Sequence, residues 1–139
     1  MIKTKGDSSL ARESLGRAYI VKKAFKKAIR EFKAAQKIAG AEGLYSAQIA
    51  LALALSGKPD EARAVIDLRL KQSGPGALSP YSLAVVFGAL GDKDQAFDQL
   101  EKALAQRDIN LTSVRVEPDL DPLRGDPRFD ALLERLNLR

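Results

Sequence analysis

The chain has 139 residues, of which 23 are Lys or Arg and 18 are Asp or Glu, and it contains neither Cys nor His. These absences exclude disulfides, thiolate nucleophiles, histidine bases and metal sites built on Cys or His ligands. The length suits one domain, and the net charge of +5 is unevenly placed: residues 1–40 hold eleven Lys and Arg against three acids, whereas residues 41–139 hold twelve against fifteen.

The amino-terminal stretch MIKTKGDSSL lacks the apolar core of a signal peptide. Farther along, the longest mostly apolar run, YSAQIALALAL, is about half as long as a membrane-spanning helix. We therefore expect a cytoplasmic protein that does not span a membrane, whether the chain is free-standing or a fragment of a longer multidomain protein.

Apolar residues at helical spacing alternate with turn residues along the chain. The pattern predicts seven helices, at about residues 8–22, 24–39, 43–56, 59–72, 79–90, 93–106 and 127–137. Gly57 and Gly91 mark two of the breaks, because glycine readily takes the left-handed conformation that ends a helix. The first break has Lys22 and Lys23 instead, so we expect a less sharply defined turn there.

The sequence repeats with a period of 34 residues, in three windows that start at Ser9, Gly43 and Ala77. The eighth and twentieth places hold small residues: Gly16, Ala50, Ala84, Ala28, Ala62 and Ala96. The seventh, eleventh and twenty-fourth places hold large apolar residues: Leu15, Ile49, Leu83, Tyr19, Leu53, Phe87, Phe32, Ile66 and Leu100. Small residues let two helices approach closely and large ones fill the space beside them, so each window predicts a packed helical hairpin.

This pattern resembles the tetratricopeptide repeat (TPR), and the stretch SLGRAYIVKKAFKKAIREFKAA of the first window matches it closely. The second window departs most, with Leu53 in place of the usual Tyr and Arg69 in place of the usual Ala. The resemblance implies one all-α domain over residues 1–139, a right-handed superhelical solenoid of three helix-turn-helix repeats. The repeats would lie at about residues 9–42, 43–76 and 77–110, with a C-terminal capping helix within 111–139.

The stretch EPDLDPLRGDPRFDALL resembles the segment that follows the last repeat in some bacterial multidomain signalling proteins. In those relatives a winged-helix, nucleotide-cyclase or kinase domain usually precedes the repeats, and this sequence holds no such domain. Ser79-Pro80 and Asp126-Pro127 each predict an N-cap followed by a first helical residue. The last helix would place four apolar residues on one face, which we expect to cover the third repeat: Phe129, Leu132, Leu133 and Leu136.

The TPR resemblance places positions 2, 5, 6, 9 and 13 of each repeat on or beside the inner face of the solenoid. In the second and third repeats these positions include Leu44, Ala47, Gln48, Leu51, Leu55, Leu78, Tyr81, Ser82 and Val85. In the first repeat they include Leu10, Glu13, Arg17 and Val21, which makes the face polar-edged there.

A large exposed apolar patch usually marks a contact surface. We therefore predict a scaffold that binds a protein or peptide segment on this inner face, with Leu51, Tyr81 and Val85 at least partly exposed. Two alternatives stay open: these residues belong to the core, or the segment 109–125 folds into the groove.

The second helix of the first repeat has an entirely basic outer side: Lys26, Lys27, Arg30, Lys33 and Lys37. The corresponding positions carry a net charge of −2 in the second repeat and −3 in the third. This gradient predicts weak head-to-tail self-association, or binding of an anionic surface through the basic helix. Because aromatic residues that could stack on bases are scarce there, an acidic protein is favoured over nucleic acid. The plain alternative is a solvated helix face.

Nothing in the sequence forms a catalytic or metal-binding constellation. Asp119, Asp121 and Asp126 lack the spacing of a calcium loop and suit turns and helix caps better. The chain has no phosphate-binding glycine loop and no pair of a nucleophile with a base. The sequence therefore predicts a binding module without cofactor or metal rather than an enzyme, and it identifies neither the partner nor the oligomeric state.

Overall fold

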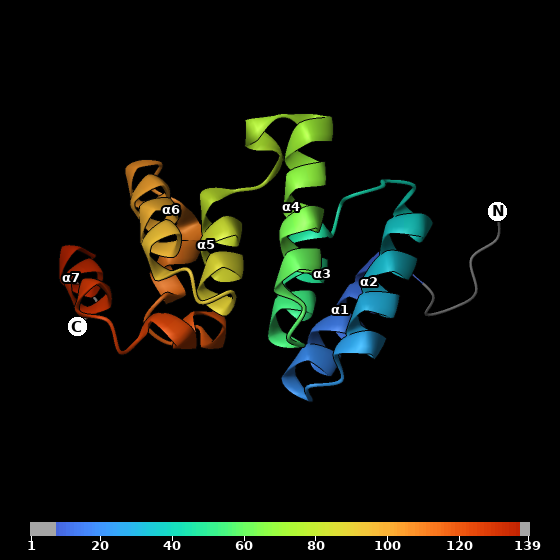
Figure 1. The fold of residues 1–139 in the computed structure, drawn as a ribbon, viewed down its shortest axis with the longest axis horizontal. Coiled ribbons are helices and arrows are strands. Elements are labelled where there is room, and N and C mark those ends of the chain that lie inside the picture. The colour runs from blue at the N-terminus through green and yellow to red at the C-terminus, as the bar shows by residue number, and fades with distance from the viewer. Residues whose placement is uncertain (1–7, 137–139) are drawn as a thin grey trace. The chain divides into compact units, whose positions relative to one another are not determined.

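A computed structural model describes residues 8–136, and the regular structure within that range is entirely helical, without strands (Figure 1). The chain divides into two compact units, Met1–Ala77 and Leu78–Arg139. The division falls one residue after the predicted boundary between the second and third repeats.

The first unit consists of two helical hairpins. Its helices are α1 (Ser9–Val21), α2 (Phe25–Ala39), α3 (Ser46–Leu55) and α4 (Pro59–Ser73), followed by the 3-10 turn η1 (Pro75–Ala77). Helix α1 packs against α2, α3 packs against α4, and α2 also packs against α3. The four helices predicted for this part of the chain are confirmed, with ends that differ by no more than three residues.

A buried cluster joins the helices of the first unit. Its fully or nearly fully buried members are Ala28, Phe32, Ala35, Tyr45, Ile49 and Ala52. The Phe32 ring is 0% exposed, and its centroid lies 6.0 Å from that of Tyr45. Gly16 of α1 lies against this ring, where a Cβ atom would come within 2.6 Å of Phe32 Cε1. The small residue at the eighth place of the repeat thus provides the space that the large residue at the twenty-fourth place fills.

The first helix of every hairpin ends in the same way. Lys23, Gly57 and Gly91 have positive φ angles of 62°, 82° and 80° and lie 34 residues apart in the sequence. The next amide donates to the carbonyl five residues back, as in a Schellman motif: Ala24 to Tyr19 (2.8 Å), Lys58 to Leu53 (2.9 Å) and Asp92 to Phe87 (2.9 Å). The expectation of a less defined turn after α1 is wrong, because these hydrogen bonds hold Lys23 in the left-handed conformation.

Replacing Lys23 by Gly should stabilise the protein. A residue with a Cβ atom is strained in the left-handed region, and glycine is not. We expect the free energy of unfolding to rise by about 0.5–1 kcal/mol in urea titrations followed by circular dichroism. Lys22→Gly is the matched control, because Lys22 has a φ of −81° and no such strain to lose. Equal effects of the two substitutions would rule out strain at Lys23.

The second unit contains the hairpin of α5 (Pro80–Ala89) and α6 (Lys93–Ala105) and the carboxy-terminal helix α7 (Pro127–Arg135). Between α6 and α7 lie two 3-10 segments, η2 (Ile109–Ser113) and η3 (Pro118–Leu123), which the sequence pattern did not predict. The predicted helices at 79–90 and 93–106 are confirmed, and so is the one at 127–137 as far as Arg135; residue 137 lies outside the described range.

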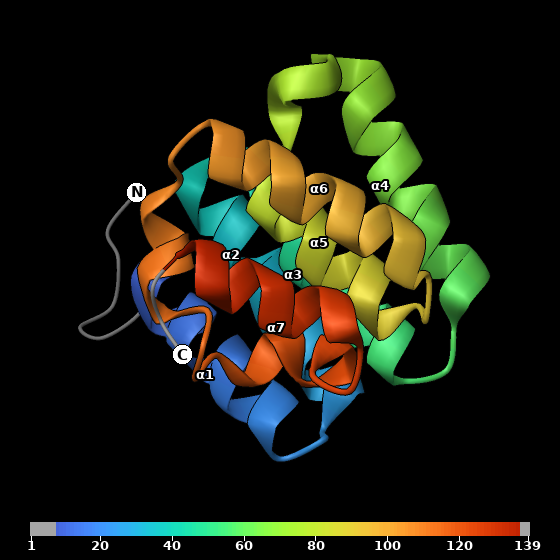
Figure 2. The ribbon, with the colours of Figure 1, turned by 90° about the vertical axis from the view of Figure 1, so that its left-hand side faces the viewer.

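Helix α7 runs beside α6 in the same direction (Figure 1 and Figure 2). Near its start, Arg128 Nη1 lies 2.9 Å from Asp94 Oδ1 of α6, and near its end Arg135 pairs with Glu101. The guanidinium of Arg128 also lies 4.5 Å from the centre of the Phe97 ring. The apolar face of α7 is buried as predicted at Phe129, Leu132 and Leu133, and partly buried at Leu136.

Two predicted caps are present in this unit. Ser79 Oγ accepts a hydrogen bond from the amide of Ser82 (3.1 Å), and Asp126 Oδ1 accepts one from the amide of Arg128 (2.9 Å). The side chain and amide of Arg128 lower the pKa of Asp126 to about 2. Asp126 therefore serves as a helix cap and Asp121 as the ion-pair partner of Arg124, in line with the turn and cap roles expected from their spacing.

Arg124 organises the segment between α6 and α7. Its Nη1 donates to the carbonyl of Arg115 (2.6 Å), its Nη2 to the carbonyl of Glu117 (2.7 Å) and its Nε to Asp121 Oδ1 (2.6 Å). The guanidinium also lies 5.1 Å from the centre of the Phe129 ring. One side chain thus ties two backbone turns to the start of α7, which gives the arginine of the DPLRGDPRF stretch a structural role.

Candidate functional site

The nine residues predicted for the apolar inner face differ widely in exposure. Leu44 and Leu55 are 49% and 41% exposed, whereas Leu51 and Val85 are each 7% exposed and Leu78 is 9% exposed. The remaining four are partly exposed: Ala47, Gln48, Tyr81 and Ser82. The five residues of the second repeat belong to the first unit, and the four of the third repeat belong to the second unit.

The prediction that Val85 is exposed is wrong, because the 3-10 segment η3 packs against α5. Tyr81, Val85 and Gly88 lie on one side of α5, at a spacing of four and three residues. A Cβ atom at Gly88 would lie 3.5 Å from Leu123 Cγ of η3. At Tyr81, burial raises the pKa of the hydroxyl to about 12, and the negative charge of Glu117 acts on this pKa in the same direction. The alternative that segment 109–125 folds over this face therefore holds for α5.

The prediction that Leu51 is exposed is also wrong. Helix α3 has the sequence SAQIALALAL and is apolar around most of its circumference. A helix of this kind is buried on most sides, and its sequence does not show which side remains in solvent. Leu51, like Leu78 and Val85, is therefore a core residue rather than part of a free binding surface.

Four exposed apolar residues of the first unit recur at equivalent places of its two repeats, whereas Leu15 and Leu68, which are 45% and 55% exposed, do not recur. Leu10 and Leu44, at position 2, are 68% and 49% exposed, and Val21 and Leu55, at position 13, are 82% and 41% exposed. We call these four residues the apolar face of the first unit. The repeat positions predicted that Leu10 and Val21 face the inner side. They were left out of the predicted site because Glu13 and Arg17 lie between them and make this side of the helix polar.

The centre of α1 gives this face a polar middle. Glu13 and Arg17 lie between Leu10 and Val21, which are eleven residues apart and thus about 16 Å apart along the helix. Both charges act on Tyr45: burial raises the pKa of its hydroxyl, Glu13 raises it further, and Arg17 lowers it. The face therefore combines apolar ends with charged and polar groups between them.

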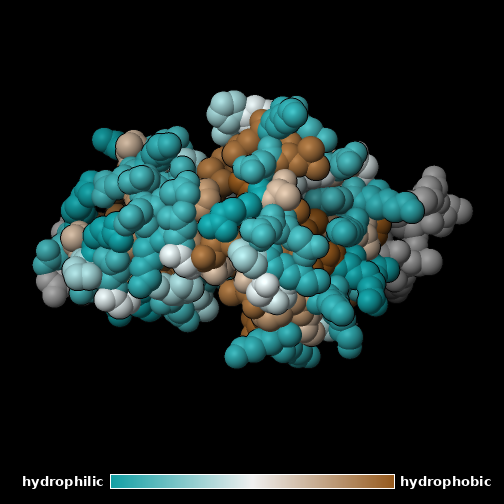
Figure 3. All heavy atoms as spheres, viewed as in Figure 1, coloured by the Kyte–Doolittle hydropathy of each residue, from teal (hydrophilic) through white to brown (hydrophobic). Residues whose placement is uncertain are grey.

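The predicted basic side of α2 is exposed in full. Its members, Lys26, Lys27, Arg30, Lys33 and Lys37, all reach solvent. In Figure 3, which has the same view as Figure 1, hydrophilic side chains cover most of the surface over α2. The ammonium group of Lys27 also lies 5.7 Å from the centre of the Tyr19 ring.

The predicted acidic side of α6 is largely neutralised within its own unit. Asp94 and Glu101, two of its three acids, pair with Arg128 and Arg135 of α7. The sequence pattern could not show this pairing, since the arginines lie 34 residues downstream. The charge gradient that suggested head-to-tail self-association is therefore much weaker than the sequence of α6 alone implies.

Arg69 replaces the small residue that the other two repeats have at the same place, Ala35 and Ala103. Its Nη1 donates to the carbonyl of Glu42 (3.3 Å), and a Cβ atom at Gly43 would lie 2.7 Å from the same nitrogen. Its Nε is buried and has no hydrogen-bond partner among the described residues. Gly43 thus makes room for a guanidinium that fastens the α2–α3 connection to α4.

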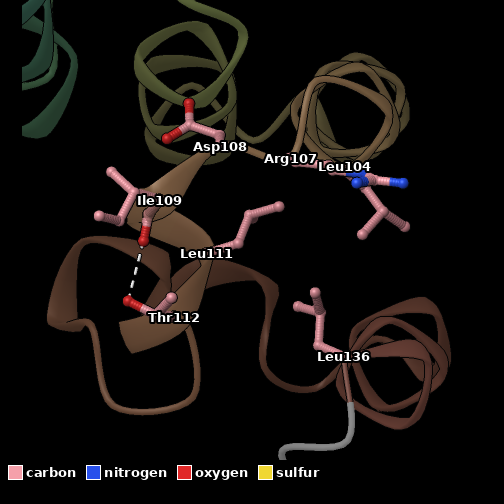
Figure 4. Close-up of a pocket in the computed structure, with 7 residues that line it drawn as sticks. All are labelled: Leu104, Arg107, Asp108, Ile109, Leu111, Thr112 and Leu136. Carbon is pink, nitrogen blue, oxygen red and sulfur yellow. Dashed lines mark hydrogen bonds between the residues drawn. The ribbon is translucent and has the colours of Figure 1, made fainter.

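The second unit has an open pocket of about 520 Å³ between the end of α6, η2 and the end of α7 (Figure 4). Its lining consists of Leu104, Arg107, Asp108, Ile109, Leu111, Thr112 and Leu136. The Thr112 hydroxyl is already used, because it donates to the carbonyl of Ile109 (2.8 Å). The walls of the pocket are mostly apolar, with the charged side chains of Arg107 and Asp108 beside them. This combination selects no single class of ligand, so we assign the pocket no function.

Within residues 8–136, no three Asp or Glu side chains come together as a metal site requires. In the same range no helix is both long enough and apolar enough to cross a membrane. Two exposed surfaces stand out among the described residues, the apolar face of the first unit and the basic side of α2. Comparisons of the chain with protein-family models, with curated proteins and with solved structures found no match.

Proposed function

We propose that this chain is a TPR-type binding module, and that the apolar face of its first unit holds a segment of another protein. The observation that carries the proposal is the recurrence of exposed apolar side chains at the same two positions of both repeats. Single exposed leucines are normal on any protein surface, whereas a repeated set forms a surface of its own. Fully burying one fully exposed side chain of this kind is worth about 1.5–3 kcal/mol, and because these four are already partly covered, burying all of them contributes about twice that.

The assignment to the TPR class is supported by backbone geometry as well as by residue type. The left-handed turns at Lys23, Gly57 and Gly91 keep the 34-residue period of the sequence repeat. A binding role is favoured over catalysis because the chain has no His or Cys to serve as general base or nucleophile.

The face also limits the shape of its partner. Leu10 and Val21 are about 16 Å apart along α1, which a partner helix spans with apolar residues eleven positions apart. An extended segment spans the same distance with about five residues. Between these anchors, a polar side chain is needed opposite Glu13 and Arg17, since covering either charge with an apolar group is costly.

A selection experiment tests this function. Peptides selected from a random phage-displayed library on the wild-type protein should lose at least about tenfold in affinity for the variant Leu44→Asp/Leu55→Asp, measured by calorimetry. Leu68→Asp is the control, because Leu68 is 55% exposed on α4 of the same unit but lies outside the face. Peptides that bind both variants as tightly as wild type, or that Leu68→Asp weakens equally, would contradict the proposal.

A further inference from the structure

Four cations form a straight line on the outer side of α2. Lys26, Arg30, Lys33 and Lys37 follow one another at spacings of four, three and four residues, which keeps them on one side of a helix. Together they extend for about 16 Å along the helix axis. Lys27 stands to the side of this line, over the Tyr19 ring.

Within the described part of the chain, no carboxylate forms an ion pair with this line of cations. Glu31 is the acidic residue of α2, and it points to α1, where its Oε2 lies 3.1 Å from Arg12 Nη1. Its side chain is only 14% exposed. Among residues 8–136, the structure shows no ion pair for any of the four cations of the line. Elsewhere in the chain basic side chains do find carboxylates, as Lys58 does with Glu61 and Arg135 with Glu101.

A second copy of the chain offers a poor complement. Its α6 carries Asp94, Asp98 and Glu101 at spacings of four and three residues, but two of these acids already pair with arginines of α7, Asp94 with Arg128 and Glu101 with Arg135. Nucleic acid is also disfavoured, because three of the four cations are lysines and, among residues 8–136, no fully exposed aromatic ring lies beside them for stacking on bases. Of the rings on or beside α2, Phe25 is partly buried against the core cluster, Phe32 is 0% exposed, and Lys27 Nζ lies over the ring of Tyr19.

We propose that the line Lys26, Arg30, Lys33 and Lys37 docks an acidic α-helix of another protein. Carboxylates spaced by four, three and four residues on that helix would have the same rise as the cations and would meet them one to one. Such exposed pairs are individually weak and are screened by salt, so the contact is short-lived and salt-sensitive. This surface is separate from the apolar face, and its test does not depend on that proposal.

Two synthetic helical peptides of identical composition test the register. One carries four Glu in a line at spacings of four, three and four residues, and the other carries the same four Glu spread around the helix. At about 50 mM salt the in-line peptide should bind at least about tenfold more tightly, and its binding should vanish by about 0.3 M salt. Equal binding of the two peptides, or no binding of the in-line peptide, would overturn the proposal.

Matched variants assign the binding to α2. Arg30→Glu/Lys33→Glu should abolish binding of the in-line peptide, whereas Arg63→Glu/Lys71→Glu on α4 makes the same change of charge on exposed residues and should retain most of it. Circular dichroism checks that both variants stay folded. An equal loss in both variants would show a net-charge effect only, and tighter binding of duplex DNA or of anionic vesicles would assign the surface to those partners instead.

Discussion

Gly16→Val should destabilise the first unit by about 2–3 kcal/mol, the largest effect we expect from a single substitution. A Cβ atom at this position would lie 2.6 Å from Cε1 and 2.7 Å from Cζ of Phe32. The ring cannot retreat, because it is 0% exposed and lies against Tyr45. Valine adds two methyl groups beyond that Cβ atom, so either α1 or the ring must move. Urea denaturation followed by circular dichroism measures the loss.

Ala18→Val is the control for this substitution, since Ala18 is exposed on the same helix and should cost only a few tenths of a kcal/mol. The clash also predicts a rescue. Phe32→Leu removes the ring atoms that Gly16 faces. The double variant should therefore lose less free energy of unfolding than the two single variants lose in total. If Gly16→Val lowers the free energy of unfolding no more than Ala18→Val does, α1 does not approach Phe32 as closely as the structure shows.

Arg124→Lys should destabilise the second unit by about 2 kcal/mol although it keeps the charge. The guanidinium donates to the carbonyls of Arg115 and Glu117 and to Asp121 at the same time. A single ammonium group cannot reach three acceptors held in that fork-like arrangement, so at least one carbonyl loses its partner. The free energy of unfolding and the hydrogen-exchange protection of residues 109–126 report the effect.

Arg115→Lys is the matched control, because Arg115 contributes a backbone carbonyl to this network and its exposed side chain is not needed for it. Its expected cost is close to zero. A similar loss in the two variants would show that the Arg124 side chain is not the group that holds this segment together.

The helices could be predicted from sequence because periodicity, glycines and caps all gave the same boundaries. The region between α6 and α7 could not, because η2 and η3 are short and Pro- and Asp-rich, and their geometry depends on Arg124. The turn after α1 was misjudged for a different reason. The preference of glycine for the left-handed conformation predicts such turns at Gly57 and Gly91. It does not reveal that hydrogen bonds impose the same conformation on Lys23.

The candidate site was predictable in part. The repeat positions correctly placed Leu44 and Leu55 at the surface, and the helical spacing of α2 correctly predicted its exposed basic side. The predicted exposure of Leu51 and Val85 was wrong because their helices, α3 and α5, are apolar on most sides. The sequence pattern therefore does not separate an inner face from a buried core. The burial of Val85 further depends on η3, a segment whose path over α5 has no signal in the local sequence.

The central claim is that the apolar face of the first unit receives the partner. Titration of the ¹⁵N-labelled protein with a peptide selected on it, followed by amide chemical shifts, tests this most directly. The largest changes should fall at and beside Leu10, Val21, Leu44 and Leu55, with little change around Leu68 of α4. Changes centred on α4, or on the second unit, would contradict the account.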